Sequence, residues 1–281
     1  MKVSNRRAWI SSCMALVLLL SACATSPESK PEAAVRLQNF MATSDELGMV
    51  ADEALQLADR LGADQVLVLF DIDNTLLAME QGLGSDQWYY WQKDLEQEDP
   101  CSSLLVNDRF QVQGALYFAS AMRPTQADAA EQVRRLQDAG LNVIAVTSRG
   151  TDYRLQTFRE LRRNGISFWP GALPPQRGFP ESFIPGGGSR PARSEEGVFL
   201  TAGQNKGVMI QALLAKTGTQ APAVIVIVDD KRSNLKDVMT AFQGTETVVH
   251  GWRYSREDAN VSAFDPEKAA EEWDALRPAL M

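Results

Sequence analysis

The sequence predicts a doubly wound α/β fold with a mostly parallel central sheet. Three short apolar runs support this prediction, and segments with apolar residues at helical spacing separate them. Unbroken runs of four or five apolar residues are typical of strands buried on both faces, as in a parallel sheet. Alternation of such strands with helices builds a doubly wound arrangement. The runs are residues 66–70, 143–146 and 224–228.

The spacing of apolar residues predicts the remaining elements. Residues 33–61 are expected to form one or two helices, broken near residues 43–45, where Ser44 or Asp45 would cap the second. Gly and Pro are frequent in residues 170–193, which favours a long irregular loop. Further helices are expected at residues 126–139, 153–163, 206–216 and 234–242, with a last strand at 247–249.

The N-terminus resembles a bacterial lipoprotein signal peptide. Three basic residues precede an apolar run at residues 14–20, which is much shorter than the about 20 apolar residues of a membrane-spanning helix. Small residues then lead to Cys23. The resemblance implies removal of residues 1–22, lipidation of Cys23 and a tether at residues 23–32, whereas an ordinary signal peptide is the alternative. It also implies a location in the bacterial cell envelope, anchored by lipid to the outer membrane and facing the periplasm.

Composition excludes several classes of function. The chain has a net charge of −8, with 28 Lys and Arg residues against 36 Asp and Glu residues. Binding to nucleic acid depends on a basic surface, so we expect no nucleic-acid partner. Anionic lipid would repel such a chain, so contact with the membrane is expected through the lipid anchor only. A single histidine excludes mechanisms and zinc sites that need several histidines.

Polar side chains follow the apolar runs, at the point where each predicted strand ends. The carboxyl ends of parallel strands meet at one edge of the sheet, where ligands bind in folds of this class. Chain segments far apart in the sequence should therefore bring carboxylate, hydroxyl and ammonium groups together. The residues concerned are Asp71, Asp73, Thr147, Ser148, Arg149, Asp229 and Asp230, together with Lys206 at the start of a predicted helix.

The order of these residues resembles the four motifs of the haloacid dehalogenase (HAD) superfamily. Those motifs are Asp-x-Asp-x-Thr, a Thr or Ser, a Lys, and an acidic pair. The chain is similar to an uncharacterised group of bacterial secreted and lipoprotein HAD-like phosphatases. It also shares its first two aspartates with the class C acid phosphatases, from which it departs at Asn74 and at residues 229–231.

The resemblance implies the HAD fold, a Rossmann-like sheet with a small helical cap inserted after the first motif strand. The core domain would then comprise residues 33–77 and 123–281, and the cap would comprise residues 78–122. Trp88 and Trp91 share one face of an expected cap helix. They would either form the core of the cap or offer a stacking surface to a substrate ring.

Physical chemistry explains why phosphoryl transfer needs these residue types. A carboxylate repels an anionic phosphoryl group, and Mg²⁺ removes the repulsion by bridging oxygens of both. Asp71 would then attack phosphorus and form a phosphoaspartate, while Asp73 would protonate the leaving oxygen and later activate water. Thr147 and Lys206 would hold the transferring oxygens.

The acidic residues are also the expected ligands of Mg²⁺. The resemblance implies metal binding by Asp71, by the main-chain carbonyl of Asp73 and by Asp229. Asp230 would either bind the metal through water or orient Lys206. Ser148 and Arg149 are candidate substrate-binding residues, although Arg149 could instead form a surface salt bridge.

These observations predict a Mg²⁺-dependent phosphoric monoester hydrolase with a small phosphorylated substrate. Two alternatives are a phosphotransferase, which uses the same intermediate, and a non-catalytic module that binds a phosphorylated ligand or an envelope protein. The intact set of predicted catalytic residues favours an enzyme, because a fold alone does not determine function.

Overall fold

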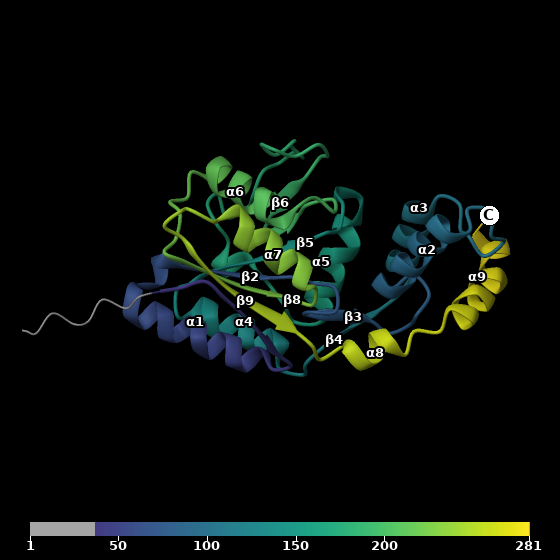
Figure 1. The fold of residues 1–281 in the computed structure, drawn as a ribbon, viewed down its shortest axis with the longest axis horizontal. Coiled ribbons are helices and arrows are strands. Elements are labelled where there is room, and N and C mark those ends of the chain that lie inside the picture. Colours follow the sequence, from purple (N-terminus) through teal and green to yellow (C-terminus); the bar gives the residue numbers. More distant parts are fainter. Residues whose placement is uncertain (1–36, 281) are drawn as a thin grey trace, which may run out of the picture. The chain divides into compact units, whose positions relative to one another are not determined.

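A computed structural model describes residues 37–280, so the predicted signal peptide and tether lie outside the described residues. Within them, seven strands form one sheet in the order β1-β9-β8-β2-β5-β7-β6 (Figure 1). All neighbouring strands are parallel except β6 and β7. The prediction of an α/β fold with a mostly parallel sheet is confirmed. The strands are β1 (Phe40–Ser44), β2 (Val66–Phe70), β5 (Asn142–Thr147), β6 (Arg193–Glu195), β7 (Val198–Leu200), β8 (Val224–Asp229) and β9 (Val248–Tyr254).

The central strand β2 is buried on both faces, as its unbroken apolar run predicts. Val66, Val68 and Phe70 belong to one core cluster, whereas Leu67 and Leu69 belong to a second cluster. Helices α1, α4 and α5 contribute apolar side chains to the first cluster, and α6 and α7 contribute to the second. Figure 1 shows α1 and α4 together on one side of the sheet. The helices are α1 (Leu47–Leu61), α4 (Ala129–Asp138), α5 (Arg154–Arg163), α6 (Lys206–Thr217) and α7 (Arg232–Ala241).

Residues 40–44 form an edge strand, and the prediction of a helix there was wrong. Phe40 is paired with His250 in a parallel ladder between β1 and β9. Main-chain hydrogen bonds to a neighbouring strand override a weak helical spacing in so short a segment. Ser44 does lie close to the start of α1, where its Oγ accepts a hydrogen bond from Glu46 N at 3.0 Å. Gln126, from a distant segment, accepts the bond of Leu47 N at 3.0 Å.

A helical segment leaves the core between two short antiparallel strands, β3 (Leu77–Met79) and β4 (Met122–Pro124). It contains α2 (Asp86–Glu98) and α3 (Arg109–Ala119). We refer to residues 80–121 together with α9 (Pro266–Leu280) as the cap, because α9 packs against α2. Helix α9 falls within the range predicted for the core domain. Helix α8 (Asp258–Ser262) connects it to β9.

Three turns of 3₁₀ helix complete the described elements. They are η1 (Ala63–Gln65), η2 (Thr151–Tyr153) and η3 (Trp169–Gly171). Between η3 and β6 the described chain contains neither helix nor strand, as its Gly and Pro content predicts. No helix among residues 37–280 is long and apolar enough to cross a membrane.

Candidate functional site

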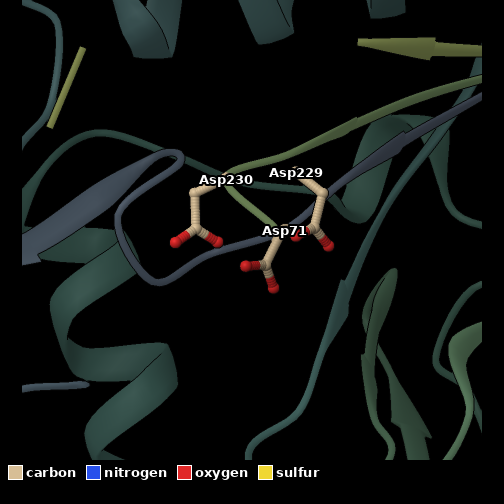
Figure 2. Close-up of side chains that lie close together, drawn as sticks. All are labelled: Asp71, Asp229 and Asp230. Carbon is tan, nitrogen blue, oxygen red and sulfur yellow. The ribbon is translucent and has the colours of Figure 1, made fainter. Parts of the chain in front are cut away.

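Three carboxylates converge at the carboxyl edge of the sheet. Asp71 follows β2 directly, and Asp229 is the last residue of β8, which is parallel to β2. Asp71 N donates a hydrogen bond of 2.9 Å to Val228 O, which joins the two strand ends. One carboxylate oxygen from each of Asp71, Asp229 and Asp230 lies within 4.8 Å of the others. Figure 2 shows the three carboxylates close together, with that of Asp71 between those of Asp229 and Asp230.

Lys206 links two of these carboxylates. Its Nζ donates to Asp71 Oδ1 at 2.7 Å and to Asp229 Oδ2 at 2.6 Å, and its side chain is 1% exposed. Lys206 begins α6, whose preceding residue Asn205 accepts a hydrogen bond from Val208 N at 3.0 Å and so caps the helix. Burial alone would lower the pKa of Lys206, but Asp229 and Asp71 outweigh it and raise that pKa. The ammonium group therefore stays charged beside Asp71.

The environment of Asp71 makes its ionisation costly. Burial raises the pKa of Asp71 to about 7, because Asp229 and Asp73 add to the effect and Lys206 only partly opposes it. A cation between the carboxylates would favour the ionised form and lower this pKa again. The arrangement is therefore suited to a bound positive charge.

Asp229 is held in place from both sides. Its Oδ1 accepts hydrogen bonds from Lys231 N at 2.8 Å and from Asn234 Nδ2 at 2.9 Å, while its Oδ2 accepts the bond from Lys206. The side chain is fully buried. These bonds fix the orientation of the Asp229 carboxylate beside Asp71 and Asp230.

Asp230 has an oxygen without a partner. Its Oδ1 is buried and makes no hydrogen bond within the described part of the chain. Burial raises the pKa of Asp230 well above its ordinary value, and Asp229 and Asp71 add to this effect. A buried carboxylate oxygen without a donor is expected to meet a cation or water. Lys206 bonds to Asp71 and Asp229, so the alternative that Asp230 orients Lys206 finds no support.

Asp73 faces a different set of partners. Arg149 donates from Nε to Asp73 Oδ2 at 2.9 Å and from Nη2 to Oδ1 at 2.8 Å. Tyr117 OH donates to Oδ1 at 2.9 Å. Burial favours the neutral carboxyl, but Arg149 and then Tyr117 outweigh it and lower the pKa of Asp73. The side chain of Asp73 is thus bound to cap and core and is not a member of the carboxylate trio.

Arg149 is not at the surface, so the alternative of a surface salt bridge was wrong. Its side chain is 4% exposed and forms a buried ion pair with Asp73. Its Nη1 also donates to Thr157 Oγ1 at 2.9 Å. The guanidinium is therefore committed to protein partners in this arrangement, because both ends of its planar fork are bonded.

The predicted hydroxyl residues lie at the end of β5. Thr147 is fully buried, and its Oγ1 accepts a hydrogen bond from Arg149 N at 3.2 Å. Ser148 is exposed. Thr75 supports the loop after β2, because its Oγ1 accepts a bond of 3.0 Å from Asp230 N.

The cap contributes a second link to the site. Lys231, the residue after the carboxylate trio, donates from Nζ to Asp86 Oδ2 at 2.7 Å. Asp86 lies in the first turn of α2. The ammonium group also lies 3.9 Å from the centre of the Tyr90 ring, a favourable cation–π arrangement. Burial raises the pKa of Asp86, although Lys231 opposes the effect.

Trp88 and Trp91 form part of the core of the cap. Trp88 is fully buried with Leu83, Leu116 and Ala269. Trp91 packs against the same cluster. This burial rules out Trp88 as a stacking surface for a substrate, because the ring has no face open to a ligand, whereas Trp91 is half-buried. The aromatic stripe instead holds α2 against α3 and α9.

Several residues of the site could not be found by inspection of the motifs. Tyr117, Asp86 and Tyr90 come from the cap, at sequence positions that no motif marks. Asn234 and Lys231 carried a weak local signal, because they stand within one helical turn of the acidic pair.

A cleft in the described part of the chain lies away from these carboxylates. It has a volume of about 550 Å³ and is lined by residues from β3, α8 and α9 and by the Arg123–Glu257 ion pair. None of the three converging carboxylates lines it. The chemistry of the carboxylates, and not the size of the cleft, therefore locates the candidate site.

Comparisons with known proteins give one family and distant likenesses to solved structures. Residues 47–281 match the family described as "Protein of unknown function (DUF2608)". No curated protein shows a significant match to the sequence. The class C acid phosphatase from Bacillus anthracis aligns with a TM-score of 0.36 and 12% identity, covering 84% of this chain and 89% of that chain. Its tungstate-bound form aligns with a TM-score of 0.35 and 12% identity, covering 80% and 85%. A likeness this low does not bear on function.

Proposed function

The chain belongs to the DUF2608 family of proteins of unknown function, and we propose that it is a Mg²⁺-dependent phosphoric monoester hydrolase of the HAD superfamily. In this proposal it acts through a phosphoaspartate at Asp71. Its substrate is a small phosphorylated molecule, and its location is the bacterial cell envelope. The domain division made from the sequence, with a core of residues 33–77 and 123–281 and an insertion of residues 78–122, belongs to the same proposal, although α9 of that core range packs with the insertion.

The observation that supports the proposal best is the group of three carboxylates around one buried lysine. Asp71, Asp229 and Asp230 bring ligand atoms within 4.8 Å of one another, and Lys206 contacts two of the three. An all-oxygen donor set is typical of hard cations such as Mg²⁺. The partnerless Oδ1 of Asp230 fits the same interpretation, because a bound cation would compensate it. When bound there, Mg²⁺ would reduce the repulsion between the carboxylates and a phosphoryl group.

The proposed reaction assigns each side chain one task. An oxygen of Asp71 forms a bond to phosphorus while the bond from phosphorus to the leaving oxygen breaks. Because Arg149 holds the resting Asp73 ionised, Asp73 passes a proton brought in by the substrate monoanion to that leaving oxygen and later takes one from the water that hydrolyses the phosphoaspartate. Lys206 and Thr147 hold the oxygens of the phosphoryl group, and Ser148 contributes a hydroxyl at the rim. Arg149 acts on this reaction through Asp73 rather than on the substrate.

Hydrolysis of para-nitrophenyl phosphate by the full-length chain tests the proposal. We expect turnover with Mg²⁺, none after the metal is removed by a chelator, and none in Asp71→Asn. Asp64→Asn is the matched control, because Asp64 is exposed and lies at the opposite end of β2. The control should retain the activity of the wild type.

Other outcomes point to the alternatives. Absence of turnover with this substrate and with panels of nucleotides and sugar phosphates would overturn the proposal and favour a non-catalytic binding module. Phosphorus NMR with added glycerol would identify a phosphotransferase by the appearance of phosphorylated glycerol.

The envelope location rests on residues outside the described part of the chain. The small residues before Cys23 and the apolar run before them support cleavage and lipidation there. Labelling of bacterial cells with radioactive palmitate should mark the wild-type chain and not Cys23→Ser. Equal labelling of both would contradict the lipid anchor, and fractionation of the membranes would test the outer-membrane assignment.

A further inference from the structure

Asp73 is held by two residues from different parts of the fold. Arg149 follows β5 in the core and makes two hydrogen bonds to the carboxylate, at 2.8 and 2.9 Å. Tyr117 lies in α3 of the cap and makes a third, at 2.9 Å. A carboxylate with three bonds from two directions has one allowed orientation. The cap therefore helps to decide where the oxygens of Asp73 point.

The Tyr117 ring is fixed as firmly as its hydroxyl. It is 4% exposed, and the Arg149 guanidinium lies over its face, 4.7 Å from the centroid. Tyr153, from η2 in the core, meets it edge-on with ring centroids 5.7 Å apart. The hydroxyl of Tyr117 thus cannot leave Asp73 unless the ring leaves the stack or α3 moves.

We propose that Tyr117 is a positioning residue, which the cap supplies to orient Asp73 for proton transfer at the leaving oxygen. The inference rests on the proposed function and adds a residue to it. A phenol donates and accepts hydrogen bonds, so Tyr117 remains bonded to Asp73 whether or not that carboxyl carries a proton. Arg149 can only donate, and it therefore favours the ionised form alone.

The proton transfer that Tyr117 serves is balanced within the proposed reaction. As the bond from Asp71 to phosphorus forms, the bond from phosphorus to the leaving oxygen breaks, and Asp73 passes to that oxygen a proton brought in by the substrate monoanion. The attacking water later returns a proton to Asp73 and gives its oxygen to the phosphate. A misoriented Asp73 slows these transfers most where the leaving oxygen is strongly basic, because such an oxygen depends most on protonation.

Tyr117→Phe separates the packing of the Tyr117 ring from the hydrogen bond of its hydroxyl to Asp73. The substitution keeps the ring in the stack and removes only the hydroxyl. The matched control is Tyr153→Phe, which also removes a hydroxyl that joins core and cap, because Tyr153 OH donates to Phe110 O at 2.8 Å. Tyr153 makes no hydrogen bond to Asp73 in the described structure. Melting curves and circular dichroism would establish that both variants fold.

The readout is kcat/KM for two substrates of different leaving groups, measured with the full-length chain and Mg²⁺. For β-glycerophosphate, whose alkoxide leaves poorly, we expect Tyr117→Phe to lower kcat/KM about tenfold, as for loss of one hydrogen bond to a charged group. For para-nitrophenyl phosphate, whose phenolate leaves readily, we expect a loss of less than about twofold. Asp73→Asn should show the same selectivity with a larger loss, and Tyr153→Phe should show none.

Failure of the inference is distinguishable from failure of the proposed function. Equal losses of Tyr117→Phe on both substrates, or no loss on either, would overturn the positioning role while the wild type still turned over. Absence of Asp71-dependent turnover in the wild type would overturn both.

Discussion

Arg123 donates two hydrogen bonds, each of 2.8 Å, to the two oxygens of the Glu257 carboxylate. The pair joins β4, at the root of the cap, to the residue before α8. Glu257 is 4% exposed, whereas the Arg123 side chain is 38% exposed. The carboxylate thus depends on a partner that water partly reaches.

We expect Arg123→Met to lower the free energy of unfolding by about 2 kcal/mol, because it leaves a buried carboxylate without its charged donor. Urea unfolding at neutral pH measures this. The control is Arg256→Met, which breaks the exposed pair of Arg256 with Glu46 and should cost less than about 1 kcal/mol. Equal losses for both variants would show that burial of Glu257 carries no special weight.

Glu195 provides a test of pH dependence. Hydrogen bonds from Arg154 lower its pKa, although burial opposes them, and Arg193 adds to the lowering. A carboxyl whose pKa is lower in the folded state stabilises the fold above its unfolded value, here 4.5. This contribution is lost as the pH falls through the folded pKa. The free energy of unfolding of the wild type should therefore exceed that of Glu195→Gln at neutral pH, and the difference should narrow below pH 4.5. A difference that widened in acid would contradict a lowered pKa of Glu195.

Gly207 follows Lys206 and faces α7 at close range. An added Cβ there would lie 2.3 Å from Asp237 O and 2.6 Å from Ala241 Cβ. We expect Gly207→Ala to force α6 away from α7, to lower the free energy of unfolding by about 1–3 kcal/mol and to displace Lys206. In contrast, a Cβ at Gly48 would come no nearer than 3.7 Å to Gln132. Gly48→Ala should therefore stabilise α1 by about 0.5–1 kcal/mol, and thermal melting of the two variants would separate these effects.

Asp230→Asn should raise the melting temperature of the metal-free protein and reduce the further rise that Mg²⁺ causes. Without a cation, three neighbouring carboxylates repel one another, and removal of one charge relieves this repulsion. The variant should therefore melt at a higher temperature than the wild type in the presence of a chelator. Addition of Mg²⁺ should raise the melting temperature of the wild type more than that of the variant, because a ligand that binds the folded state stabilises it. An equal Mg²⁺ response of both proteins would argue against metal binding by Asp230.

The sequence predicted best where the local pattern and the tertiary environment agree. Val66 to Phe70 are apolar without interruption, and they form the strand that is buried on both faces. Asp71 and Asp229 lie together because β2 and β8 are parallel neighbours, whose carboxyl ends meet at one edge of the sheet. Phe40 was misassigned because its pairing with His250 depends on a strand more than two hundred residues further along the chain.

The site residues that the sequence analysis did not identify also depend on contacts between distant parts of the chain. Tyr117 reaches Asp73, and Asp86 reaches Lys231, only because the cap folds back to the carboxyl edge. A hydroxyl or carboxylate on a cap helix carries no local mark of its partner. For Trp88 the local pattern was visible but ambiguous. Its helical spacing suits a cap core and a ligand surface equally well, and only its burial in the structure distinguishes the two.

The two edge strands of the described sheet differ in how readily they would pair with a strand of another molecule. Strand β6, at one edge of the described sheet, has three residues and places the charged pair Arg193 and Glu195 beside the free main chain. Short, charged edges discourage pairing with another molecule. Strand β1, at the other edge, has five residues and begins with Phe40 and Met41. Aggregation of partly unfolded molecules should therefore start at β1, and a lysine in that strand, rather than in β6, is the change expected to improve recovery on refolding.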